Sequence, residues 1–201
     1  MRYLLGLMLA LMSVSVYSQT QRVKIDGVED FPPDMVTSLG SFECTKGGYP
    51  TGLYECSGDS GIHIRKLEGY TCLLTPDLEV MGTTWFELNT NWDAQYTGPV
   101  FGNWIIVLSE DCDKSVLQDP DDYFVGTFKG KRRLEMQGPD PVWTGEWKLD
   151  GWGVGTYSGV QFKSINEYLM YTALPLPFEL TGMGTGPEGA FSAEMIVHDE
   201  D

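Results

Sequence analysis

The sequence is poor in the residues that most often build metal and catalytic sites. Its 201 residues include two histidines and four cysteines, and no two cysteines form a Cys-x-x-Cys pair. Zinc sites are built mostly from closely spaced cysteine and histidine ligands. The chain is therefore not expected to hold zinc, and no residue stands out as catalytic.

Positive charge is also scarce. The chain has 13 lysine and arginine residues against 29 aspartate and glutamate residues, which gives a formal net charge of −16. Such a surface repels phosphate backbones and anionic lipid, so we expect neither a nucleic-acid partner nor membrane insertion of the mature chain. The charge favours solubility, divalent cations and cationic partners without specifying any of them.

Long apolar runs are missing except at the start of the chain. Residues 4–16 are mostly apolar, follow the basic Arg2, and lead to the small residue Ser18 before Gln19. This is the pattern of a secretory signal peptide, and the run is shorter than the ~20 residues that a spanning helix needs. We expect residues 1–18 to be removed and the mature protein to be secreted or periplasmic.

The cysteines indicate a disulfide framework, because an even number in an exported chain is typical of paired thiols. Four cysteines allow three connectivities, which the sequence alone does not separate. The pairing that we prefer joins Cys44 to Cys56 across one hairpin and Cys72 to Cys112 across the body of the domain.

The sequence shows short runs in which apolar and polar residues alternate, and it shows no helical periodicity. They recur roughly every 8–12 residues between turn-forming segments, which is typical of an antiparallel barrel or sandwich. Glycines close to aromatic residues allow the strong coiling of a barrel. We predict an all-β fold with a single antiparallel up-and-down barrel over residues 38–197, and a two-sheet β-sandwich as the alternative. Residues 19–37 are expected to form an extended N-terminal lead-in, and residues 198–201 an acidic tail.

The longest alternating run surrounds Asp150-Gly151, a dipeptide typical of a two-residue hairpin turn. A turn at this point places Trp147 opposite Val154. It also turns Trp152 toward the same interior face.

Four short glycine-containing motifs recur along the chain: Gly82-Thr83, residues 98–102, Trp143-Thr144-Gly145 and residues 153–159. Together they resemble motifs in a set of exported bacterial proteins of unassigned function. More distantly, their pattern is similar to that of calycin-like and allene oxide cyclase-like barrels. The resemblance covers about residues 54–184 and implies a barrel. It carries over no catalytic residue, and the Gly-x-Trp mark of lipocalins is absent from the first strand.

Seven aromatic residues in the predicted strands are candidates for lining a ligand cavity. In a barrel they either fill the interior or surround a small apolar or sugar-like ligand. A filled interior is favoured, because aromatic side chains dominate core energetics. The candidates are Trp85, Trp104, Phe124, Phe128, Trp143, Trp147 and Trp152.

One acidic loop has the residue spacing of an EF-hand calcium site, and calcium binds several oxygen ligands. However, Val116 occupies the position at which an EF-hand needs glycine, and strands rather than helices are expected on both sides. A solvated acidic loop is therefore favoured over calcium, and no other cofactor is expected. The candidate ligands are Asp111, Asp113, Ser115, Asp119 and Asp122.

Residues 123–137 are predicted to form one long strand, and it contains four of the basic residues: Lys129, Lys131, Arg132 and Arg133. An anion site is one explanation. We favour an exposed strand whose charges discourage edge-to-edge aggregation.

These features predict a secreted β-barrel with a non-catalytic binding or structural role. The alternative is a cyclase-like isomerase that folds a flexible apolar substrate within an aromatic cavity. A filled interior with an exposed apolar rim favours the interaction module, whereas a cavity that holds a carboxylate favours the enzyme. The sequence does not specify the ligand or the oligomeric state.

Overall fold

The computed structural model describes residues 21–30, 32, 34–137, 140–172 and 187–197. Of these, residues 134–137, 140–147, 164–172, 187–193 and 197 are described by their backbone alone. The expected signal peptide (1–18) and acidic tail (198–201) lie outside the described residues. In the part of the chain that is described, no helix is long and apolar enough to cross a membrane.

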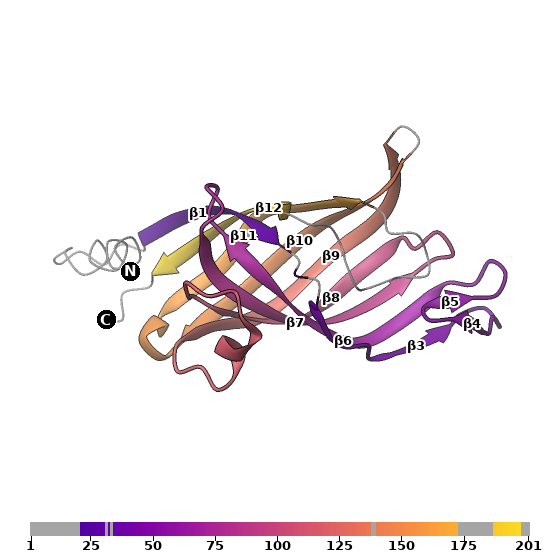
Figure 1. The fold of residues 1–201 in the computed structure, drawn as a ribbon, viewed down its shortest axis with the longest axis horizontal. Helices are drawn as coiled ribbons and strands as arrows, with labels where there is room; N and C mark the ends of the chain where they lie inside the picture. The colour runs from indigo at the N-terminus through magenta and orange to yellow at the C-terminus, as the bar shows by residue number, and fades with distance from the viewer. Residues whose placement is uncertain (1–20, 31, 33, 138–139, 173–186, 198–201) are drawn as a thin grey trace.

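The architecture is all-β, as the sequence predicts, and two short 3-10 helices are its only helices among the described residues (Figure 1). The elements are β1 (Gln21–Asp30), β2 (Val36–Ser38), β3 (Ser41–Cys44), β4 (Pro50–Gly52), β5 (Glu55–Cys56), β6 (Ile62–Leu74), β7 (Val80–Trp92), β8 (Gly98–Val107), η1 (Lys114–Leu117), β9 (Tyr123–Gln137), β10 (Asp140–Val154), η2 (Gly155–Tyr157), β11 (Val160–Thr172) and β12 (Pro187–Val197).

Eight long strands form one antiparallel sheet in the order β1-β12-β11-β10-β9-β8-β7-β6. The first and last of these also pair with each other, because residues 28–30 of β1 lie against residues 72–74 of β6. The pairings therefore form a ring of eight strands. Strands β2 and β3 add to the free edge of β6, and β4 pairs with β5 in a separate small sheet.

Strand alternation places one set of side chains on the inner face of the ring. On β8, Val100, Trp104 and Ile106 are buried, whereas Phe101 and Asn103 between them are exposed. The same period of two holds on β9, where Phe124, Phe128 and Arg132 are buried and Val125, Lys129 and Lys131 are exposed. The inner side chains form a single hydrophobic cluster that also includes Ile62, Ile64, Leu67, Trp92, Phe124, Phe128, Phe162 and Met195.

The turn predicted at Asp150-Gly151 is wrong. Strand β10 runs through both residues, and the chain turns at Gly155 and Gly159, whose φ values are +68° and +82°. Gly151 serves a different purpose, because a Cβ atom there would lie 2.6 Å from the ring of Trp104. The glycine lets the large side chain of Trp104 on β8 pack directly on the backbone of β10, two strands away.

The longer strand also corrects the predicted pairing. Trp147 lies opposite Glu167 in the backbone register, not opposite Val154. Trp152 pairs with Gln161 and lies on the outer face, where 52% of its surface is exposed.

The expected lead-in is corrected in part as well. Residues 21–30 are extended, but they are the strand β1 that joins β12 to β6 and completes the ring. On this strand Val23 and Ile25 pack against the inner cluster, and Glu29 is buried. The segment is therefore an integral part of the sheet.

Both preferred disulfides are present. Cys44 is bonded to Cys56, and Cys72 to Cys112, with Cα–Cα distances of 5.7 and 5.4 Å. The first bridge ties β3 to β5, and the second ties β6 to the loop that follows β8. Two disulfides fit an oxidising extracellular or periplasmic compartment.

Removing the bridge between Cys72 and Cys112 should destabilise the protein more than removing the bridge between Cys44 and Cys56. The two bridges span sequence separations of 40 and 12 residues, and the entropy of the unfolded chain depends on the size of the closed loop. We expect the two double-alanine variants to differ by about 1 kcal/mol in free energy of unfolding. Urea melts of both variants measure this difference, and a larger loss from the shorter bridge would contradict it.

Candidate functional site

Three of the seven predicted aromatic residues lie on the inner face and contact one another through their neighbours. Trp104 is 1% exposed, and its ring centroid is 5.4 Å from that of Phe162. Phe124 lies 5.5 Å from Phe162 and stacks on Tyr157 at 4.8 Å. Phe128 is buried in the same cluster. These aromatic side chains pack as a core on the inner face of β8, β9 and β11.

Trp104 is fixed by polar contacts as well as by packing. Its indole Nε1 donates a hydrogen bond of 2.9 Å to the carbonyl oxygen of Thr127. Cβ atoms built at Gly126 and Gly151 would lie 2.7 and 2.6 Å from its ring, so the indole rests on the backbones of β9 and β10. The space beside Trp104 is therefore filled.

The other predicted aromatic residues do not join this cluster. Trp85 is half-buried and Trp152 exposed, and the register places both in one row across the outer face with Ile105 and Val125. The side chains of Trp143 and Trp147 lie outside the described residues.

A buried carboxyl group lies on the inner face, where β1 meets β6. Glu29 Oε1 accepts a hydrogen bond of 2.5 Å from the Thr71 hydroxyl, and both side chains are buried. Thr84 lies directly opposite Thr71 on β7. Its hydroxyl is buried and has no hydrogen-bond partner among the described residues. We call Glu29, Thr71 and Thr84 the inner polar group; it is one of the departures from an apolar interior, and the buried Arg132 is another.

Burial raises the pKa of Glu29 from its ordinary value of 4.5 to about 7, and the hydrogen bond from Thr71 opposes this rise only in part. A carboxyl group with a pKa near 7 can both release and accept a proton at neutral pH. This is the chemistry of a general acid or base, although buried structural carboxyl groups share it.

The inner polar group was not found from the sequence. Its acidic member lies in the segment expected to be a lead-in, where a buried position is not anticipated. The alternation of Val23, Ile25, Gly27 and Glu29 is a signal that places all four residues on one face. The signal indicates the face but not its burial, which depends on pairing with distant strands.

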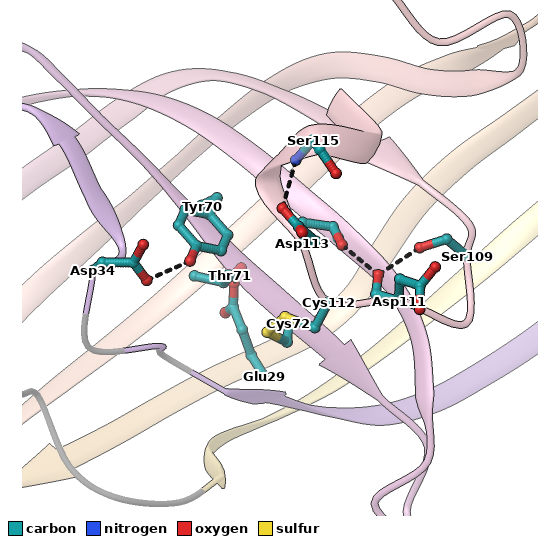
Figure 2. Close-up of a disulfide and its surroundings, with 11 residues drawn as sticks. Glu29, Asp34, Tyr70, Thr71, Cys72, Ser109, Asp111, Cys112, Asp113 and Ser115 are labelled. Carbon is teal, nitrogen blue, oxygen red and sulfur yellow. Dashed lines mark hydrogen bonds between the residues drawn. A yellow bond between two sulfur atoms is a disulfide. The ribbon is translucent and has the colours of Figure 1, made fainter. Parts of the chain in front are cut away.

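A second set of polar contacts lies on the outer face, around the bridge between Cys72 and Cys112 (Figure 2). The Tyr70 hydroxyl donates to Asp34 Oδ1 at 2.5 Å, and Lys114 Nζ lies 3.2 Å from Asp34 Oδ2. The Tyr70 hydrogen bond and Lys114 hold the pKa of Asp34 below its usual value, and burial with Asp34 raises the pKa of Tyr70 to about 12. These contacts fasten the loop onto β6.

The acidic loop predicted as a weak calcium candidate uses its oxygens for local contacts. Asp113 Oδ1 accepts from the backbone N–H of Ser115, and Asp122 Oδ1 accepts from the backbone N–H of Thr156. The Asp111 carbonyl oxygen accepts from Thr83 and Ser109, as Figure 2 shows in part. Within the described residues, no three His, Cys, Asp or Glu side chains are grouped so that they could hold a metal ion.

The basic residues of β9 are divided between the two faces. Arg132 is buried on the inner face, and its guanidinium carbon lies 4.9 Å from the centroid of the Trp92 ring. Lys129, Lys131 and Arg133 are exposed on the outer face. Alternation along one strand therefore makes Arg132 part of the core and leaves the other three on the surface.

Comparison with known proteins adds no family to this description. No family model, no curated protein and no solved structure matches the chain.

Proposed function

We propose that this chain is an exported β-barrel that acts as a non-catalytic binding module and binds its partner on the outer face. The eight-stranded ring supports a closed barrel, since closure removes the exposed edges of a sheet. The observation that carries the proposal is the packing of Trp104 against Phe162 and against the backbones of β9 and β10. Because the protein's own side chains occupy the inside of the ring of strands, we infer that a partner binds to the outer face.

Two further observations support this function. The disulfides suit a protein that works outside the cytoplasm. The outer face also carries large apolar side chains that remain exposed, including Phe101, Val125 and Trp152. Exposed aromatic residues on a rigid sheet are suitable anchors for a partner.

The proposal is tested by titrating the protein with an uncharged apolar dye and with a long-chain fatty acid while tryptophan emission is recorded. We expect no saturable one-to-one binding inside the barrel, because Trp104 fills the space that such a ligand would enter. The Trp85→Phe/Trp152→Phe variant separates the two faces, since it removes the two tryptophans of the outer row and keeps the buried Trp92 and Trp104. Saturable binding whose emission change persists in this double variant would contradict an outer binding surface.

A second candidate function is favoured by the inner polar group. A cyclase-like isomerase needs an acid or base within an apolar interior, and Glu29 has a pKa near 7 and accepts a hydrogen bond from the Thr71 hydroxyl. The same titration addresses this candidate. Interior binding that is weakened by Glu29→Gln would support the isomerase over the binding module.

A further inference from the structure

The outer face of β9 and β10 carries a strip of exposed positive charge. Lys129, Lys131 and Arg133 lie on this face of β9, and Lys148 lies beside them on β10. These four residues, which we call the outer basic strip, belong to a chain with a formal net charge of −16. Outward residues on one strand are separated by about 6.6 Å, so the strip is a linear array.

One acidic residue faces the strip in the backbone register, because Glu146 lies directly opposite Lys131. Where side chains are described, no Asp or Glu oxygen lies within the 4.0 Å ion-pair distance of any of its four members. Lys129 is directly opposite Lys148 in the register of β9 and β10. Like charges directly opposite each other destabilise a sheet. A chain with 29 acidic residues thus places cations together at a cost in stability, as a site for an anion requires.

Aromatic, neutral polar and acidic residues border the strip in successive rows across the strands. Phe101 on β8 is 40% exposed and lies opposite Lys129, so the basic row begins with an aromatic ring. The next outward row along the strands contains Asn103 and Thr127, with Glu87 opposite Asn103 on β7 and the exposed Asp150 opposite Thr127 on β10. The row after that ends at the exposed ring of Trp152. Two aromatic rings therefore lie on either side of a row with amide, hydroxyl and carboxylate groups on the outer face of the sheet.

We propose that this face binds an anionic polysaccharide with about one carboxylate per sugar. The C–H groups of a sugar ring suit the electron-rich faces of Phe101 and Trp152. Its hydroxyl groups suit the amide of Asn103 and the hydroxyl of Thr127. Its carboxylates suit the outer basic strip through charge-assisted hydrogen bonds. This inference rests on the proposed outer binding surface and names the partner of that surface.

The charge of the whole chain separates this ligand from other polyanions. Duplex DNA carries about one negative charge per 1.7 Å, and a long contact would bring many phosphates against an acidic surface. A polymer with one charge per sugar has a lower charge density, so four cations can match a short segment of it. At physiological ionic strength the screening length is about 8 Å, which limits repulsion from distant carboxylates.

The experiment measures binding of polygalacturonate by calorimetry or biolayer interferometry at two salt concentrations. Methyl-esterified polygalacturonate serves as the matched neutral polymer, and duplex DNA as a second polyanion. We expect polygalacturonate to bind at least tenfold more tightly than either, and more weakly as salt rises. The variant Lys129→Gln/Lys131→Gln/Lys148→Gln should weaken binding at least tenfold. It should melt at the same temperature as the original protein or slightly higher, because it removes a like-charge pair.

A control variant, Lys24→Gln/Lys46→Gln/Lys66→Gln, removes three exposed lysines elsewhere and should bind within twofold of the original protein. Trp152→Ala should weaken binding severalfold without changing its salt dependence. Several results would overturn the inference: no binding of polygalacturonate at low salt, equal losses in the two triple variants, or tighter binding of DNA. Equal binding of the esterified polymer that depends on Trp152 would also overturn it, and would leave the outer binding surface standing.

Discussion

The Trp104→Ala variant is expected to lose about 3–5 kcal/mol of its free energy of unfolding. The indole is 1% exposed, packs on Phe162, and donates its N–H to the Thr127 carbonyl oxygen. Truncation removes the transfer free energy of the ring and leaves a cavity, because the glycine backbones beneath it cannot move in to fill the space. It also removes the hydrogen bond that the Thr127 carbonyl oxygen accepts from the indole. Chemical denaturation followed by circular dichroism measures the loss.

Trp152→Ala is the matched control. It removes the same kind of side chain from the outer face of β10, whereas Trp104 lies on the inner face of β8. Because 52% of this residue is exposed, we expect a loss of at most about 2 kcal/mol. Equal losses in the two variants would mean that Trp104 does not fill the interior. The binding-module proposal would then lose its main support.

Much of the local structure follows from the period of two in the sequence. The predicted strand over residues 123–137 has the bounds of β9, and the exposed and buried residues on β8 alternate as its sequence requires. The disulfide pairs are also those preferred from the sequence. These features depend on neighbours along the chain, or on the small number of ways to pair four cysteines.

The errors come from residues whose purpose is set by distant parts of the chain. Asp150-Gly151 has the composition of a hairpin turn, but Gly151 is needed for the approach of Trp104 from two strands away. Asp150 instead accepts a hydrogen bond of 2.8 Å from Gln161 on β11. Local turn chemistry cannot distinguish these two uses of a glycine.

The candidate site was anticipated less well than the fold. Trp104 and Phe124 are interior residues, as strand alternation predicts, whereas Trp152 was assigned to the wrong face because the predicted turn changed its register. Glu29 was missed because its burial arises from the pairing of β1 with β12 and β6, more than 40 residues away in each case. Pairing between such distant strands, which closes the ring, leaves no signal in the local sequence.

The buried carboxyl group should make the protein less stable as the pH rises from about 4.5 to 7. An unfolded chain releases the Glu29 proton near the ordinary pKa of 4.5, whereas the folded protein retains it up to about 7. Between these values the folded state binds more protons than the unfolded state, so this group lowers the free energy of unfolding with rising pH. The full stability is present below the lower pKa, and the loss is complete above the higher one. The difference between the two pKa values corresponds to roughly 3 kcal/mol.

The Glu29→Gln variant isolates this contribution, because glutamine keeps an oxygen that can accept the Thr71 hydrogen bond and does not ionise. We expect the variant to be about as stable as the original protein at pH 4 and roughly 3 kcal/mol more stable at pH 8. The comparison cancels other carboxylates, including Asp34, whose lowered pKa acts in the opposite direction. Asp30→Asn, one residue further along β1, should follow the pH profile of the original protein. Urea melts at a series of pH values measure all three proteins, and parallel profiles for the original protein and Glu29→Gln would show that Glu29 is ionised in the folded state at neutral pH.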